Sequence, residues 1–141
     1  MILNRKNLKF EIDFDFILIA LTTSLKDYRT CYLINKNLNF NFVRQDDLKL
    51  DIGPGNGEVL FSIYQYTWET TETEFNFIGN KGSDGYLVPE MREADYFILI
   101  KNYIDESDVE SIISGLNKIP EIVAAVKIEP KKIKSRENLL F

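Results

Sequence analysis

Side chains that could exchange protons or bind a polar ligand stand at several separate places along the chain. In order they are Arg29, Asp46, Asp47, Lys81, Glu90, Asp95 and Tyr96. Pro89 joins them as an eighth candidate, because it belongs to the same segment as Glu90, Asp95 and Tyr96. Two carboxylates can act as acid and base without a histidine, and carboxylate oxygens can also hold Mg²⁺ or Ca²⁺. No EF-hand spacing connects these carboxylates. We therefore expect no catalytic residue and no metal site, and we keep the eight residues as candidates for binding.

Four of the eight lie in the segment 88–96, which reads VPEMREADY. Pro89 stiffens the start of this segment, while Glu90 and Asp95 flank a short connector. A structural interpretation makes both carboxylates local acceptors for backbone N–H groups. An enzyme would instead need Glu90, Asp95 and Tyr96 to converge with Lys81 or Arg29 in one concave pocket.

The chain has no histidine and one cysteine among its 141 residues. This excludes a Ser-His-Asp triad, a Cys-His pair, an internal disulfide and a cysteine-ligated metal cluster. The glycine-rich loop 51–57 lacks the lysine of a phosphate-binding loop, and a strand is expected after it rather than a helix. We expect no cofactor, and these absences favour binding over catalysis.

Two apolar features are candidate interfaces. Tyr64, Tyr66 and Trp68 alternate along one strand face. Such a row can stack bases or sugars, but it more often packs under a helix or across a dimer interface. The chain ends on Leu139, Leu140 and Phe141, and each side chain gains roughly 1.5–3 kcal/mol when it is buried. The C-terminal tail, residues 131–141, is expected to dock on its own domain or, alternatively, on a partner subunit.

Charge is distributed unevenly along the chain. The net charge is −5, of which residues 131–141 contribute +3, so residues 1–130 carry −8. An acidic body argues against binding to nucleic acid through phosphates. The longest apolar stretch, 16–20, is far shorter than the ~20 residues that cross a bilayer. Without a signal peptide pattern at the N-terminus, we expect a cytoplasmic protein that does not bind membranes.

Hydrophobic periodicity predicts one α+β domain over residues 1–141. Strands are expected at 14–22, 58–68, 74–79, 94–101 and 122–128, with a weaker one at 46–52 and helices near 25–38 and from a capping box at 107–110. The strand at 14–22 is apolar on both faces, which is typical of a covered central strand. Reduced to its strongest elements, the order is β-α-β-β-α-β with an additional strand. This predicts a ferredoxin-like core with a mostly antiparallel sheet covered by two helices.

Segment 88–96 resembles the motif Ile-Pro-Glu-x-x-x-Val-Asp-Tyr that names a family of small bacterial proteins, found chiefly in Bacteroidetes. The stretches 26–29 (KDYR), 46–48 (DDL), 80–82 (NKG) and 134–141 (KSRENLLF) are also similar to that family. Val88 and Ala94 stand where the motif has Ile and Val. The family has no established activity to transfer, so the resemblance implies only a soluble bacterial protein. The closing strand-helix-strand unit, 96–128, looks like half of a small regulatory module of the ACT type.

Three functions stay open from the sequence. The preferred one is a non-enzymatic binding or protein-interaction module, with a homodimer as one expectation. The alternative is an ACT-like sensor of a small ligand bound between the glycine loops and segment 88–96. The third is an enzyme that uses carboxylate or lysine chemistry.

Overall fold

The computed structural model describes residues 16–53, 55 and 57–141. Its strands and helices, in chain order, are β1 (Phe16–Thr23), α2 (Asp27–Leu38), β2 (Val43–Arg44), β3 (Leu48–Asp51), β4 (Glu58–Phe61), β5 (Ile63–Trp68), β6 (Thr73–Gly79), β7 (Lys81–Gly82), β8 (Gly85–Tyr86), β9 (Tyr96–Lys101), α3 (Glu106–Asn117) and β10 (Ile122–Ile128). Three short 3₁₀ turns complete the described chain: η1 (Pro89–Met91), η2 (Pro130–Lys132) and η3 (Arg136–Leu139).

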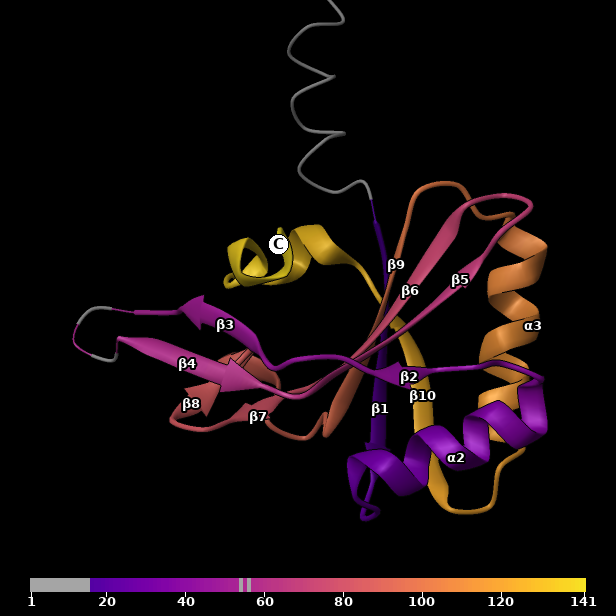
Figure 1. Ribbon diagram of the computed structural model, residues 1–141, viewed down its shortest axis with the longest axis horizontal. Coiled ribbons are helices and arrows are strands. Elements are labelled where there is room, and N and C mark those ends of the chain that lie inside the picture. Colours follow the sequence, from indigo (N-terminus) through magenta and orange to yellow (C-terminus); the bar gives the residue numbers. More distant parts are fainter. Residues whose placement is uncertain (1–15, 54, 56) are drawn as a thin grey trace, which may run out of the picture.

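Six strands form an antiparallel sheet in the order β10-β1-β9-β6-β5-β2 (Figure 1). Strand β9 lies between β1 and β6 and is antiparallel to both, so β1 and β6 run in the same direction. Leu21 near the end of β1 and Gly79 at the end of β6 both lie opposite Tyr96. The chain therefore leaves β1 and β6 at the same end of the sheet, and the candidate site lies at this end.

The α+β class, the mostly antiparallel sheet and the two helices agree with the prediction, whereas the order of the six strands does not match that of a four-stranded ferredoxin-like sheet. Strands β5 and β2 extend the sheet beyond β6. The single strand predicted at 58–68 is in fact two strands that separate at Ser62. β4 pairs with β3 outside the main sheet, and β5 pairs with β6 inside it. The alternating pattern continues through Ser62. Such a pattern indicates which side chains are buried but not which strand is the partner, so it did not reveal the change of partner.

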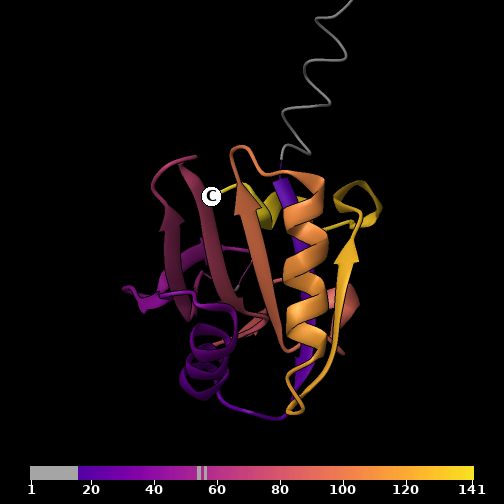
Figure 2. The same cartoon turned by 90° about the vertical axis from the view of Figure 1, so that its right-hand side faces the viewer.

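Both helices cover the same face of the sheet, which is the right-hand side in Figure 1 and faces the viewer in Figure 2. Ile34 of α2 and Leu116 of α3 are fully buried against this face. The helix predicted from a capping box at 107–110 begins earlier, at Glu106, with Asp105 as its N-cap residue. The carboxylate of Asp105 accepts a hydrogen bond from the hydroxyl of Tyr103 instead of capping the helix.

The opposite face of the sheet is covered by the β3-β4 and β7-β8 pairs and by the C-terminal tail (Figure 1). Its core contains Phe61 from β4, Val88 from the segment before β9, and Ile133 and Leu139 from the tail. β1 and β9 therefore lie between two apolar cores, as their apolar residues on both faces require.

Two predicted features concern the N-terminus and membranes. Residues 14 and 15, which begin the first predicted strand, lie outside the described residues. Within the described part of the chain, neither helix is long and apolar enough to cross a membrane.

Candidate functional site

Asn80, directly after β6, organises the segment that leads to β9. Its side chain is fully buried, and its Nδ2 donates hydrogen bonds to the carbonyl oxygens of Met91 and Ala94, both at 2.9 Å. Its Oδ1 accepts a hydrogen bond from the backbone N–H of Val88 at 2.8 Å. One asparagine side chain thus fixes both ends of the irregular connector between residues 88 and 94.

Glu90 connects this connector to the C-terminal tail. Its carboxylate accepts hydrogen bonds from the backbone N–H of Ser135 at 3.0 Å and from the Ser135 hydroxyl at 2.9 Å. Burial on its own would raise the pKa of Glu90, but hydrogen bonds, chiefly from Ser135 and also from the backbone of Glu90 and Lys134, outweigh it and hold that pKa below its ordinary value. Glu90 therefore acts as a local acceptor that holds the tail, which is the structural interpretation of this residue.

Asp95 and Tyr96 hold the segment that follows β1. Asp95 Oδ2 accepts a hydrogen bond from the backbone N–H of Thr23 at 2.9 Å, and the Tyr96 hydroxyl donates to the carbonyl oxygen of Leu25 at 2.7 Å. The backbone N–H of Asp95 also donates to the carbonyl oxygen of Leu21 at 2.8 Å. The two side chains position the turn between β1 and α2.

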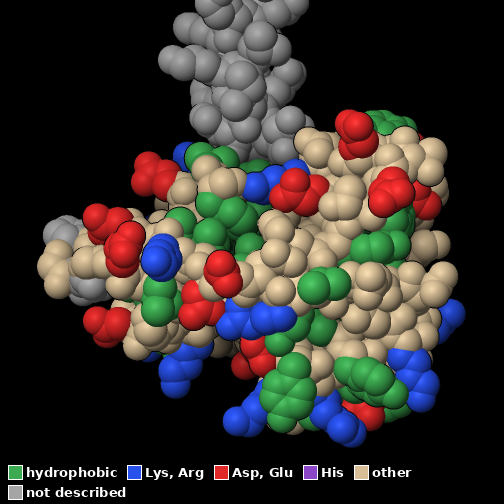
Figure 3. Space-filling model, viewed as in Figure 1, with side chains coloured by type: hydrophobic (Ala, Val, Ile, Leu, Met, Phe, Trp, Pro, Cys, Tyr) green, Lys and Arg blue, Asp and Glu red, His purple; other side chains and the backbone are tan. Residues whose placement is uncertain are grey.

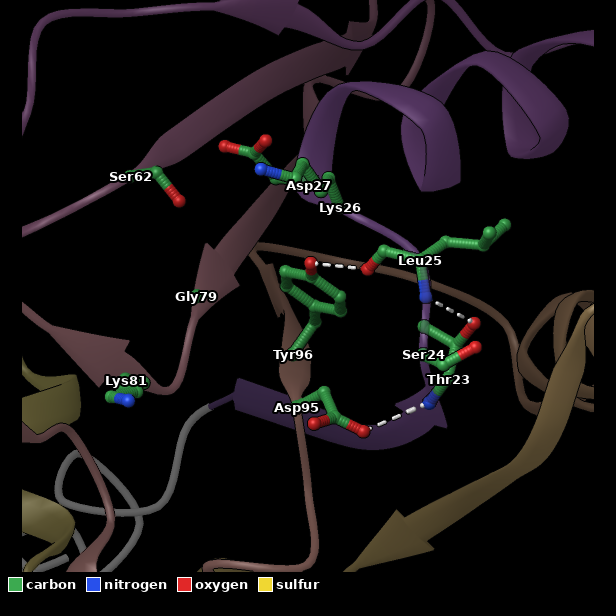
Figure 4. Close-up of a pocket in the computed structure, with 10 residues that line it drawn as sticks. All are labelled: Thr23, Ser24, Leu25, Lys26, Asp27, Ser62, Gly79, Lys81, Asp95 and Tyr96. Atoms are coloured by element: carbon green, nitrogen blue, oxygen red, sulfur yellow. Dashed lines mark hydrogen bonds between the residues drawn. The ribbon is translucent and has the colours of Figure 1, made fainter.

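A pocket of about 740 Å³ opens between this turn and the end of β6. It is lined by Thr23, Ser24, Leu25, Lys26, Asp27, Ser62, Gly79, Lys81, Asp95 and Tyr96. In Figure 4, Asp95 and Tyr96 lie near the middle, residues 23–27 run along the right and top, and Ser62, Gly79 and Lys81 lie on the left. Three of the eight predicted binding candidates, Lys81, Asp95 and Tyr96, therefore line one pocket.

The pocket combines charges of both signs. Lys26 and Lys81 are exposed, and neither ammonium group forms a salt bridge within the described residues. Asp27 and Asp95 supply carboxylates at the same opening. Ser24 and Ser62 add hydroxyl groups that can donate or accept.

Tyr96 is a hydrogen-bond donor in this site rather than a base. Burial, and secondarily the negative charges of Asp27 and Asp95, raise the pKa of Tyr96 to about 12. Burial and the charge of Asp27 likewise raise the pKa of the neighbouring Tyr64 to about 12. Both phenols thus stay protonated at neutral pH. The Cys31 thiol is also held protonated, since burial raises its pKa further.

The other binding candidates lie elsewhere. Arg29 is exposed on α2, and Asp46 and Asp47 are exposed between β2 and β3, where Asp47 forms a salt bridge of 2.6 Å with Arg44. Pro89 begins η1, and Glu90 is bonded to the tail. The convergence that an enzyme would need is therefore partial, because Arg29 and Glu90 do not reach the pocket that holds Lys81, Asp95 and Tyr96.

Metal ligands do not cluster in the described part of the chain: no group of three or more His, Cys, Asp or Glu side chains there could hold a metal ion.

The aromatic row is built into the core under the helices. Tyr64 is only 8% exposed, and its ring meets that of Phe77 edge-on at 5.8 Å. Tyr66 and Trp68 are partly buried and lie 4.9 Å and 6.2 Å, between ring centroids, from Phe40. Tyr64 is thus not available as an interface with a partner. This is a correction to its place among the candidate interface residues.

The apolar C-terminus folds back onto its own domain. Leu139 is fully buried on the second face of the sheet, while Leu140 is half exposed. Phe141 is partly buried, its ring lies 4.4 Å from the ammonium of Lys101, and that ammonium also donates to the Phe141 carbonyl oxygen. Leu139 is therefore unavailable to a partner, a second correction to the candidate interface. Leu140 keeps an exposed apolar surface.

Sequence reasoning missed Asn80 and the turn 23–27. Asn80 stands in a loop-like stretch of Asn, Gly and Ser, where asparagine ordinarily indicates a turn. The available signal for residues 23–27 was positional, since these polar residues join a buried strand to a helix.

Comparison of the chain with protein-family models, with curated proteins and with solved structures finds no match.

Proposed function

We propose that this chain is a non-enzymatic binding domain for a small zwitterionic molecule, such as an α-amino acid. The observation that carries the proposal is the gathering of Lys26, Lys81, Asp27 and Asp95 around one pocket of about 740 Å³. That volume is typical of small-molecule sites.

The charges fit a ligand that carries both an ammonium and a carboxylate. The exposed ammonium groups of Lys26 and Lys81 suit a ligand carboxylate through charge-assisted hydrogen bonds. Asp95 uses Oδ2 for the Thr23 N–H, which leaves Oδ1 to accept from a ligand ammonium. The protonated Tyr96 and the wholly buried Asn80 keep the pocket walls in place, as binding requires.

Titration with free α-amino acids tests this proposal. We expect at least one of them, at about 10 mM, to raise the Tm, because a ligand that binds only the folded state stabilises it. The N-acetyl and the amide derivatives of that amino acid lack one of the two charges and should bind about tenfold more weakly, or worse, in isothermal titration calorimetry. If none of the amino acids changes the Tm, or if both derivatives bind as well as the parent, the proposal is wrong.

Variants locate the site. Lys81→Met and Asp95→Asn should each weaken binding about tenfold. The matched control is Lys118→Met, since Lys118 is an exposed lysine at the end of α3 and does not line the pocket. Equal affinity in all three variants would place the ligand elsewhere.

The ACT-like regulatory role is a finer form of this proposal, in which the bound ligand controls a partner. The ferredoxin-like relationship, membership of the motif-named family, a homodimer and a cytoplasmic location stay predictions. Light scattering on the chain with and without residues 136–141 tests the homodimer, and a monomer in both forms would exclude it.

A further inference from the structure

The sheet has an open edge along the outer half of β5. Strand β2 pairs with β5 only at Tyr64 and Gln65, although β5 continues to Trp68. Among the described residues, no strand pairs with this edge beyond Gln65. Figure 2 shows the upper part of β5 as the outermost strand on the left, clear of α2.

The backbone of Thr67 faces outward at this edge. The Gln45 N–H donates to the carbonyl oxygen of Ile63 at 2.9 Å, so the polar backbone groups of Ile63 point towards β2. In an antiparallel ladder the groups of alternate residues point the same way. Those of Thr67 therefore point out of the sheet and can pair with an added strand.

A hollow of about 520 Å³ adjoins this edge and is lined by residues 66–71. Tyr66 and Trp68 supply aromatic surface, and Glu69 supplies a carboxylate. Aromatic rings and carboxylates both attract ammonium and guanidinium groups.

The surroundings are acidic. Residues 50–80 contain no lysine or arginine, and the turn between β5 and β6 contributes exposed Glu69 and Glu72. The Thr73 hydroxyl donates a hydrogen bond to the carbonyl oxygen of Tyr103, in the loop that leads into α3. The first turn of that helix carries Glu106 and Asp108. In Figure 3 acidic side chains gather at the upper right, over this end of the molecule.

We propose that the outer edge of β5 binds an extended, basic peptide segment of a partner protein by strand addition. The peptide backbone pairs with Thr67, and its lysine or arginine side chains lie over Trp68 and beside Glu69 and Glu72. Strand addition obtains affinity from main-chain hydrogen bonds and specificity from alternate side chains. The charge of the edge selects the basic partner.

Trp68 is the chain's single tryptophan, so its fluorescence reports directly on this edge. The probes are three octapeptides in which valine alternates with lysine, valine alternates with glutamate, and proline alternates with lysine. We expect saturable binding of the valine–lysine peptide with a change in Trp68 emission, and at least tenfold weaker binding of the other two. The glutamate peptide has the wrong charge, and the proline peptide lacks half of the N–H donors.

Two variants test the same contacts in the full chain. Thr67→Pro removes the outward N–H, a change that an edge strand tolerates, and should abolish peptide binding while the far-UV circular dichroism spectrum stays unchanged. Glu69→Gln with Glu72→Gln should weaken binding about tenfold. Its control, Glu121→Gln with Glu129→Gln, changes the same charge beside β10, at the opposite edge of the sheet. Should Thr67→Pro not fold, the glutamate pair still decides the question.

The proposal is wrong if the valine–lysine peptide does not bind at about 1 mM. It is also wrong if the proline–lysine peptide binds equally well, because binding would then need only charge. The proposal is likewise wrong if the control, Glu121→Gln with Glu129→Gln, weakens peptide binding as much as Glu69→Gln with Glu72→Gln does.

Discussion

The side chain of Asn80 should contribute more to stability than any polar side chain on the surface. It makes three hydrogen bonds to backbone groups of the connector between β8 and β9, and it is fully buried. Asn80→Ala deletes one acceptor and both donors at once. The Val88 N–H and the Ala94 carbonyl are then left without a partner in a buried environment.

The magnitude follows from these bonds. A buried backbone group that loses its partner costs about 1–3 kcal/mol. The Met91 carbonyl lies in a partly buried bond that water can replace. We therefore expect Asn80→Ala to lower the free energy of unfolding by about 3–5 kcal/mol, a large part of the 5–15 kcal/mol typical of a domain.

Asn80→Asp tests the direction of the hydrogen bonds. The aspartate keeps the acceptor for Val88 but at neutral pH places a carboxylate against two carbonyl oxygens. Burial and these oxygens raise its pKa above the unfolded value near 3.9. Stability that depends on the protonated form is present at low pH and is lost as pH rises through the folded pKa. Asn80→Asp should therefore be more stable near pH 4 than near pH 7, relative to the wild type.

Urea denaturation followed by circular dichroism measures these changes, with Asn41→Ala as the control because Asn41 is exposed. The control should lie within about 0.5 kcal/mol of the wild type. If Asn80→Ala loses less than about 1 kcal/mol, or if Asn80→Asp shows no gain in relative stability on acidification, the role assigned to Asn80 is refuted.

Three further predictions concern the tail and the pocket. Leu139→Ala should cost about 2–5 kcal/mol of unfolding free energy, because it empties a fully buried site, while the half-exposed Leu140→Ala should cost far less in the same urea titration. The lowered pKa of Glu90 means that its contribution is present above its unfolded pKa and is lost on acidification, so Glu90→Gln should flatten the acid side of the profile of Tm against pH. Tyr96 must stay protonated to donate to the Leu25 carbonyl oxygen, and burial raises its pKa to about 12. The stability that this hydrogen bond contributes is therefore present below pH 10 and lost between about pH 10 and 12. Tyr96→Phe should be less stable than the wild type at pH 8 and should lose less unfolding free energy as the pH rises over that range.

The apolar cores on both faces of the sheet were predictable from the sequence, because the local pattern of apolar residues indicates which strand faces are buried. Apolar residues occupy both faces of the strand that begins at Phe16, and this identifies a covered central strand wherever its partners lie. The same logic finds β9. It fails at Ser62, where the alternation of Val59, Phe61 and Ile63 runs on although the chain passes from one sheet to another. Pairing is decided by contacts with distant segments, which no local period encodes.

The candidate site was predictable only in part for a related reason. Asp95 and Tyr96 stood out because they close the segment 88–96 where a buried strand begins, and Lys81 because it lies in the stretch 80–82. Their common pocket depends on β1 and β6 running in the same direction on either side of β9, which is a property of the sheet. The same sheet buries Tyr64 and brings Leu139 onto its second face. These two side chains therefore pack within the domain, which is one of the two arrangements that the sequence left open for them.

Folding and binding share side chains at this site. Asp95 satisfies the Thr23 N–H with one carboxylate oxygen, and Tyr96 satisfies the Leu25 carbonyl with its hydroxyl. A variant that removes either side chain therefore releases the turn 23–27 and disturbs the pocket wall together with any ligand contact. Asp95→Asn avoids this ambiguity, since the amide oxygen still accepts from Thr23 and only the negative charge is lost. A loss of affinity in Asp95→Asn without a loss of stability would thus assign the charge to the ligand, whereas equal losses of both would assign it to the fold.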